Sequence, residues 1–225
     1  MNFLRRFFKR RWNRNSDKNQ AEEKIMEFQL LYNKAVYMNT ILTDELITGI
    51  QDSLEQRYQM VESWDLVYST YENGFSLKTL LTCLSNKKPP YIFVCQDVNK
   101  NIFGAFFATK IEIKNSAFGK LNSFLFKFSE SHSTESMENK NCTEQISANC
   151  ESKVSIYRAS GENTYFCLCT IDYLAFGCSD GHFGLLFNSD ILSGESYPVT
   201  TFYNECLSSK QKFFIERLEV WSVDV

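Results

Sequence analysis

The residues best suited to chemistry in this sequence lie around one of its two histidines. His182 stands in the stretch Gly181-His182-Phe183-Gly184, shortly after Cys178, Ser179 and Asp180. Nucleophilic catalysis needs a nucleophile, a base and an orienting group held together. One interpretation is therefore a redox-linked or hydrolytic enzyme that uses His182 with Cys178 or Ser179. The alternative is a tight turn, in which the glycines supply positive φ and His182 hydrogen-bonds locally.

Metal and nucleotide chemistry find weaker support. Cys167 and Cys169 would share one face of a strand, but no second cysteine pair or histidine completes a zinc site, so we expect buried, small apolar residues. Asp97 and Asn99 begin like a calcium loop, but no closing Glu follows at the right spacing, which favours a hairpin turn. The glycines of 177–184 match no nucleotide-binding pattern. The sequence thus predicts no catalytic residue, metal ligand or cofactor.

One short polar segment is a candidate binding position. Gly161, Glu162 and Asn163 are expected to form a loop between two strands, where Asn163 would tolerate left-handed geometry. If the strands pair in order, Glu162 faces the same neighbourhood as the later glycine-rich turn.

Glu219 is the other unusual carboxylate, because it lies in an apolar terminal strand. Alternation places Leu218 and Val220 toward the core, so that Glu219 and Trp221 share the opposite face. We expect that face, and Glu219 with it, to be exposed to solvent.

Composition bounds the class of protein. The chain has 225 residues, of which 44% are hydrophobic, and its 20 Phe and 11 Tyr favour strands. Residues 1–14 carry six cations and no acid, whereas the whole chain has a formal charge of −3, so the remainder carries −9. An acidic body is unsuited to binding nucleic acid through a general basic field. No run is long enough to span a membrane and no secretory signal is evident, which predicts a cytoplasmic protein with reduced thiols.

The chain divides into a tail, a helix and one domain. Residues 1–20 form a basic, aromatic-rich tail, and within it 1–14 would be either a membrane-surface helix or a disordered segment. Apolar residues at helical spacing predict an amino-terminal helix within 21–40. We assign 41–225 to the domain, with a polar, flexible insertion at 129–152, because that segment cannot bury enough apolar surface to become ordered.

Most of the domain reads as antiparallel sheet. Thr43 is a candidate N-cap for a helix that buries Leu46 and Ile50, and a second short helix is expected at 77–84. Period-two patterns and turn residues predict strands at 64–70, 91–96, 102–109, 121–128, 154–158, 164–170, 173–176, 184–187 and 213–223. Many short strands with the helices concentrated early indicate an α+β fold built on a two-sheet β-sandwich.

An ordered set of motifs then points to a known family. In chain order they are Trp64-Asp65-Leu66-Val67-Tyr68-Ser69-Thr70, Gly74-Phe75-Ser76, Gly161-Glu162-Asn163, Gly181-His182-Phe183-Gly184, Thr201-Phe202 and Leu218-Glu219-Val220-Trp221. Together they resemble the TLDc domain over about 41–221. The sequence departs from the family at Thr164, where Asp is usual, at 178–180, where glycines are usual, and at Val199, where Cys is usual.

The resemblance implies an antiparallel β-sandwich with flanking helices and a role in resistance to oxidative stress. It also implies a binding module that contacts subunits of the vacuolar proton-pumping ATPase on the cytosolic side and regulates the pump. No established catalytic activity accompanies the family. The expected location is cytoplasmic, or peripheral on endolysosomal or vacuolar membranes. A separate hypothesis is a membrane-associated adaptor that acts through residues 1–14.

Overall fold

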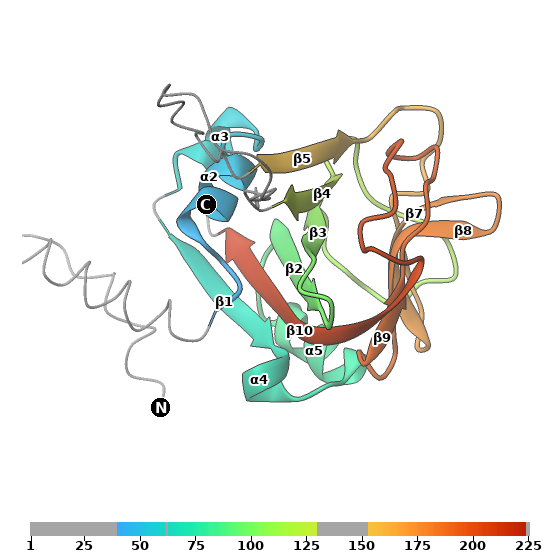
Figure 1. The fold of residues 1–225 in the computed structure, drawn as a ribbon, viewed down its shortest axis with the longest axis horizontal. Coiled ribbons are helices and arrows are strands. Elements are labelled where there is room, and N and C mark those ends of the chain that lie inside the picture. The colour runs from blue at the N-terminus through green and yellow to red at the C-terminus, as the bar shows by residue number, and fades with distance from the viewer. Residues whose placement is uncertain (1–39, 62, 130–152, 224–225) are drawn as a thin grey trace, which may run out of the picture.

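The chain is seen in a computed structural model that describes residues 40–61, 63–129 and 153–223. The predicted basic tail and nearly all of the predicted amino-terminal helix and polar insertion lie outside these residues. Two antiparallel sheets stack in the described part, with short helices that all precede the second strand (Figure 1). The predicted α+β sandwich is therefore confirmed. No helix in the described ranges is long and apolar enough to cross a membrane.

The helices begin where the sequence supplies capping side chains. They are α2 (Asp44–Gln51), α3 (Gln56–Gln59), α4 (Thr70–Asn73) and α5 (Leu77–Ser85). The Thr43 side chain accepts a hydrogen bond from the Leu46 N–H, as predicted for an N-cap. The Ser76 side chain caps α5 in the same way by accepting from the Thr79 N–H. These caps provide acceptors for N–H groups of the first helical turn, which have no acceptor within the helix.

The first sheet holds six strands in the order β5-β4-β3-β2-β10-β1. Its members are β1 (Trp64–Ser69), β2 (Tyr91–Asp97), β3 (Ile102–Phe107), β4 (Phe124–Ser129), β5 (Lys153–Arg158) and β10 (Lys212–Val223). The second sheet runs β10-β9-β8-β7-β6. Its further members are β6 (Cys167–Cys169), β7 (Tyr173–Ser179), β8 (His182–Asn188) and β9 (Ser193–Glu195).

Strand β10 belongs to both sheets. Its first residues pair with β9, and from Ile215 onward it pairs with β2, with a register irregularity between Ile215 and Arg217. Its last residues also pair with β1. In Figure 1 the strand crosses the molecule from the β7–β9 side to the β1 side. A single strand thus fixes how the two sheets lie relative to each other.

Several predicted boundaries were wrong. The predicted strand 164–170 shrinks to Cys167–Cys169, and the predicted strand 121–128 begins only at Phe124. The expected turn 177–181 shortens to Asp180-Gly181, where both residues have positive φ, so His182 is the first residue of β8 and not a turn residue. Strand β9 was not predicted, because Ser-Gly-Glu carries no strand pattern.

Two apolar cores flank the first sheet. The core between the sheets joins residues of both, as in the contact of Phe93 with Phe176, whose ring centroids lie 5.0 Å apart. A second core lies between the other face of the first sheet and α2, and it includes Leu46, Ile50 and Trp221. Because both faces of this sheet are covered, its central strands are almost wholly apolar.

Candidate functional site

The predicted polar residues fall into two separate groups. The first, here called the loop cluster, consists of residues 160–163, 178–182 and 197–203. The hydrogen bonds of Asn163 with Thr200 and Thr201, and of Thr201 with Cys178, bring these three segments together. Sequence reasoning proposed the first two segments as candidate binding positions, whereas in the third it noted Thr201-Phe202 only as a family motif.

Asn163 and Thr201 fasten the cluster. The Asn163 Nδ2 donates to Thr200 Oγ1 at 3.2 Å, and its Oδ1 accepts from the Tyr165 N–H at 3.0 Å. The buried Thr201 hydroxyl accepts from the Cys178 N–H at 3.0 Å and lies 3.0 Å from Asn163 Oδ1. Asn163 therefore connects its own loop to β7 through Thr201, which is a positioning role.

Glu162 lies on the exposed rim of the same cluster. Its carboxylate accepts a hydrogen bond from the phenol of Tyr203, and this contact raises the pKa of Tyr203. Tyr203 remains 61% exposed. Gly161 precedes Glu162 with φ of +84° and open space around it, so its backbone conformation and not crowding favours glycine. The pair of Glu162 and Tyr203 is the part of the cluster most available to a partner.

His182 does not join a catalytic triad in this geometry. Its ring stacks on Tyr197, with centroids 4.4 Å apart, and its strand position lies opposite Ser179. The Ser179 hydroxyl accepts from the Thr200 N–H at 3.1 Å. Within the described residues, no hydrogen bond joins the imidazole to Cys178, Ser179 or Asp180. The stacked ring therefore packs against the segment that carries Tyr197.

The two remaining predicted glycines have different roles. Gly181 completes the two-residue turn with φ of +77°. At Gly184 an added Cβ would lie 2.8 Å from Leu125 Cδ1 and 2.9 Å from the Phe176 carbonyl oxygen. Gly184 thus permits close packing of β8 inside the sandwich.

Four of the described thiols, those of Cys95, Cys167, Cys169 and Cys178, are poorly suited to nucleophilic chemistry. Burial raises the pKa of Cys95 and Cys167 well above the ordinary value, and it raises that of Cys169 to about 11. The pKa of Cys178 is also raised, first by burial and then by the Asp180 carboxylate. Cys167 and Cys169 are fully buried, which confirms their predicted role as small core residues. In the part of the chain that the structure describes, no group of three or more His, Cys, Asp or Glu residues could hold a metal ion.

The predicted hairpin turn after β2 is confirmed. Asp97 is fully buried, and its Oδ1 accepts from the backbone N–H groups of Asn99 and Asn101 at 2.9 Å. Its Oδ2 accepts from Asn101 Nδ2 at 2.8 Å and from the Ser208 hydroxyl at 2.5 Å. The carboxylate is thus fully occupied in holding the turn.

Glu219 forms the second polar group, and here the predicted solvent exposure is wrong. The alternation itself is correct, since Leu218 and Val220 face the inter-sheet core. The opposite face is covered by the segment before α2, so the exposed fraction of Glu219 is 0%. Period two in a sequence assigns a side chain to a face but does not say what packs on that face.

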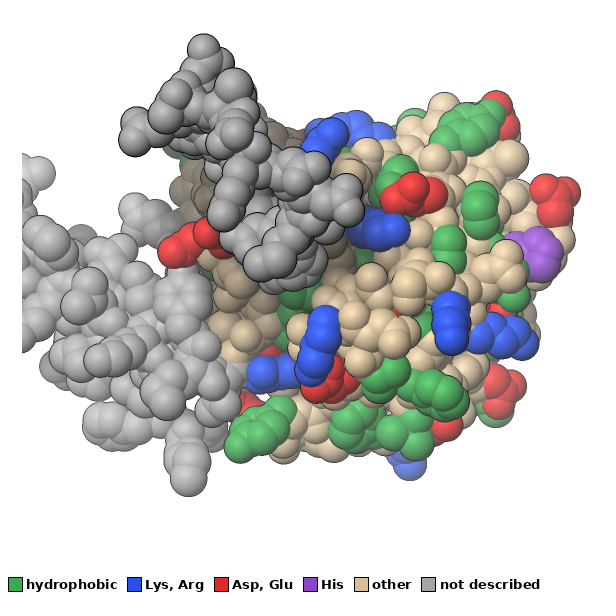
Figure 2. Space-filling view, in the orientation of Figure 1, with side chains coloured by type: hydrophobic (Ala, Val, Ile, Leu, Met, Phe, Trp, Pro, Cys, Tyr) green, Lys and Arg blue, Asp and Glu red, His purple; other side chains and the backbone are tan. Residues whose placement is uncertain are grey.

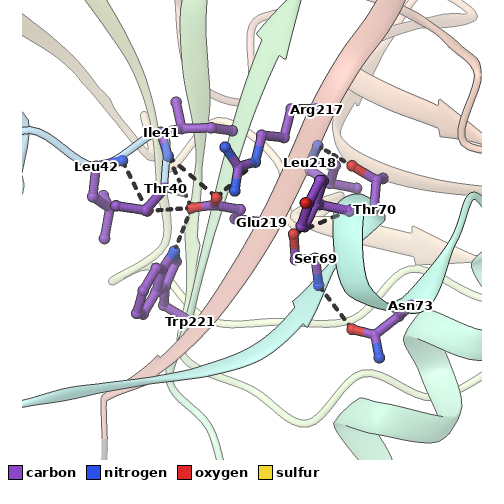
Figure 3. A network of polar contacts seen from close by, with 11 residues as sticks. Thr40, Ile41, Leu42, Ser69, Thr70, Asn73, Arg217, Leu218, Glu219 and Trp221 are labelled. Carbon is purple, nitrogen blue, oxygen red and sulfur yellow. Dashed lines mark hydrogen bonds and ion pairs between the residues drawn. The ribbon is translucent and has the colours of Figure 1, made fainter. Parts of the chain in front are cut away.

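Four neighbours surround this carboxylate, and with it they form the clasp of Thr40, Ile41, Arg217, Glu219 and Trp221 (Figure 3). The Thr40 hydroxyl donates to Oε2 at 2.6 Å, and the Ile41 N–H lies 3.2 Å from both carboxylate oxygens. The Trp221 Nε1–H donates to Oε2 at 3.2 Å, and Arg217 Nε forms an ion pair with Oε1 at 3.0 Å.

The electrostatics of the clasp are a balance. Burial raises the pKa of Glu219, whereas the Thr40 hydrogen bond, the Arg217 charge and the donors from Ile41 and Trp221 lower it in part. Burial has the largest effect, so the net direction is upward. In the clasp, burial makes the charge of the carboxylate unfavourable. Its hydrogen-bond donors and the arginine come from two short segments, 40–41 and 217–221.

Comparisons with known proteins agree with the motifs. A sequence profile of the TLDc domain matches residues 36–224. The chain is 32% identical over 161 residues to "Nuclear receptor coactivator 7" of Homo sapiens, a match that covers 72% of this chain and 15% of that protein. It is 30% identical over 161 residues to "Oxidation resistance protein 1" of Homo sapiens, covering 72% of this chain and 16% of that protein. The chain thus spans a small part of the length of these relatives.

The profile match extends over most of the sequence, and the ordered motifs build the loop cluster and the clasp of a sandwich in which one strand crosses both sheets. This chain therefore belongs to the TLDc domain family.

Proposed function

We propose that this chain is a non-catalytic binding module that acts in oxidative-stress resistance by binding the vacuolar proton-pumping ATPase on its cytosolic side and regulating it. Family membership supports the proposal, together with the name of the relative "Oxidation resistance protein 1". The match covers only a small part of that relative, so we assign the activity of the whole relative to this chain only as a proposal.

The geometry of the loop cluster is the observation that carries the proposal. Internal hydrogen bonds of Asn163 and Thr201 fix three loops, while Glu162 and Tyr203 remain at the surface. Such a preorganised polar and aromatic rim suits a protein partner, because little conformational entropy is lost on binding. His182 stacks on Tyr197, and the pKa of Cys178 is raised, so the same residues are less suited to hydrolysis or thiol chemistry.

The distribution of surface charge also favours a protein partner over nucleic acid. Figure 2 shows Lys and Arg side chains scattered over the visible face and interleaved with Asp and Glu. Ion pairs of the described residues include those of Lys127 with Glu205 and of Lys100 with Glu216. A continuous basic stripe, the usual footprint of a phosphate backbone, does not occur on that face.

The direct test is affinity purification of the full chain from cell lysate, followed by identification of the proteins recovered. We expect ATPase subunits with the unaltered chain and fewer of them with Tyr203→Ala. Tyr71→Ala is the matched control, because Tyr71 is also an exposed tyrosine, at 73%, but lies in α4. Failure to recover any ATPase subunit, where a related TLDc protein recovers them, would contradict the proposal.

We further propose a cytoplasmic location, with peripheral attachment to endolysosomal or vacuolar membranes through the ATPase. The adaptor hypothesis predicts that attachment requires residues 1–14, with their six cations and interleaved aromatic residues. Membrane fractionation of the full chain and of a variant lacking residues 1–14 separates the two. Equal membrane fractions would exclude the adaptor role, and loss of attachment with ATPase binding retained would support it.

A further inference from the structure

The segment Thr40–Leu42, here called the strap, lies on the first sheet without belonging to it. Within the described residues, no backbone–backbone hydrogen bond joins the strap to a strand. The strands beneath it are held differently, because β10 pairs with β2 over Ile215–Ser222 and with β1 over Glu219–Val223. The strap and the sheet therefore depend on different interactions.

Between the described residues, the polar contacts of the strap with the sheet converge on one side chain. The Thr40 hydroxyl and the Ile41 N–H both donate to the Glu219 carboxylate, and the Leu42 N–H donates to Thr40 Oγ1 within the strap. The remaining hold is apolar, since Ile41 and Leu42 are 6% and 4% exposed and belong to the helix-side core.

The chain on the far side of the strap is anchored independently. Thr43 is extended and caps α2, and α2 is seated by Leu46 and Ile50, which are both fully buried. A rotation at Thr43 could therefore lift the strap while α2 stays in place. The backbone ladder of β10 would also stay intact, because Glu219 uses its side chain for the strap and its backbone for the sheet.

We propose that the strap is a releasable cover that hinges at Thr43, is held by the Glu219 carboxylate, and opens without unfolding of the sandwich. Opening would expose the carboxylate together with the indole of Trp221, which is 5% exposed when the strap is closed. Sub-global opening of this kind is expected where a segment has few backbone hydrogen bonds and a local anchor. The loop cluster takes no part in this opening.

The Ile41 amide is a direct reporter, because among the residues that the structure describes its N–H is bonded only to the Glu219 carboxylate in the closed state. Amide hydrogen exchange of the full chain, read residue by residue by NMR, compares Ile41 with Val220 of β10. We expect the Ile41 amide to exchange faster than that of Val220. Its exchange rate should also depend less on low concentrations of denaturant, as is usual for local openings. Thr40→Val should accelerate Ile41 exchange about tenfold, because one hydrogen bond to a charged acceptor is lost, and should leave Val220 unchanged.

Thr48→Val is the matched control, because the exposed Thr48 hydroxyl donates to the Asp44 carbonyl oxygen within α2 and makes no hydrogen bond to the strap or to the described residues of the sheet. It should change neither amide. Glu219→Gln keeps one acceptor oxygen but replaces the other with an NH2 group, which cannot accept the hydrogen bonds that converge there from Thr40, Ile41 and Trp221. It should therefore accelerate exchange at Ile41 and not at Val220. The proposal is overturned if Ile41 and Val220 exchange with equal rates and equal denaturant dependence. It is also overturned if Thr40→Val leaves Ile41 unchanged, or if Glu219→Gln accelerates both amides alike.

Discussion

The loop cluster and the clasp each use one polar side chain to fasten a distant segment, but they do so under opposite conditions. Asn163 is neutral and half-buried, and it bonds to hydroxyl groups and a backbone N–H at 3.0–3.2 Å. Glu219 carries a carboxylate, is fully buried, and gathers three donors and an arginine. A neutral amide at a rim loses little hydration, whereas a buried charge must be compensated in full. The clasp should therefore be much less tolerant of change.

Truncation of the clasp gives the largest expected effect. Glu219→Ala would leave the Ile41 N–H, the Trp221 N–H and the Arg217 charge without their acceptor in a buried site. We expect a loss of about 3–5 kcal/mol in the free energy of unfolding, as is usual when one partner of a buried pair is removed. Urea unfolding followed by circular dichroism measures it.

Glu112→Ala is the control for that experiment. Glu112 pairs with Lys110 and Lys114 at the surface, where solvent screens an ion pair and it contributes little to stability. A loss at Glu219 no larger than the loss at Glu112 would show that the clasp is not a stabilising element.

The loop cluster should respond less strongly. Asn163→Ala removes the acceptor shared by Tyr165 N–H and Thr201 and the donor to Thr200, at a position that water can partly reach. We expect a loss of about 0.5–1.5 kcal/mol, the usual net contribution of a neutral hydrogen bond. Asn99→Ala, in the exposed hairpin turn, should change stability by less than about 0.5 kcal/mol. A value for Asn163 as small as that for Asn99 would remove its positioning role.

The pH dependence separates the two regions further. The folded pKa of Glu219 is raised above the ordinary 4.5, so the folded chain binds this proton more tightly than the unfolded chain does. Its contribution to stability is therefore fully present below 4.5 and is lost as the pH rises through the folded pKa. Glu219→Gln has no such group. In urea unfolding at several pH values, the stability of the unaltered chain relative to Glu219→Gln should increase as the pH falls, and the opposite slope would contradict the assignment.

Much of the fold could be predicted because local chemistry decides it. Thr43 was predicted to be the N-cap of α2 and is one, and the alternation in β4 and β10 places residues on the correct faces. The misjudged elements are those that tertiary contacts define. Strand β9 exists because β8 and β10 lie on either side of it, and β6 is short because Asn163 bonds the chain before it into a loop.

The candidate site could be predicted only in part, for the same reason. Glu162 and Asn163 are visible as polar residues in a loop, but Thr200, Thr201 and Tyr203 join them only through the folding of a segment nearly 40 residues later. The burial of Glu219 depends on Thr40 and Ile41, which lie 179 and 178 residues away in sequence. His182 looked like a base because sequence proximity to Cys178 and Ser179 resembles a triad. Its stacking on Tyr197 gives it a different environment.

The exposed pair of the loop cluster gives the smallest expected effect on stability and the sharpest test of a local contact. Tyr203→Phe should leave the free energy of unfolding nearly unchanged, because the pair is at the surface. The contact itself should still be visible in titration, since the Glu162 carboxylate raises the pKa of Tyr203. Glu162→Gln should lower that pKa toward the ordinary 10.0 in an NMR titration of labelled tyrosine rings. Glu205→Gln is the matched control. The pKa of Tyr157 is raised first by burial and then by its contact with Glu205, whereas Glu205 has no part in raising that of Tyr203. If Glu205→Gln moved Tyr203 as much as Glu162→Gln did, the shift would reflect the general acidity of the rim, and Glu162 would no longer be its specific partner.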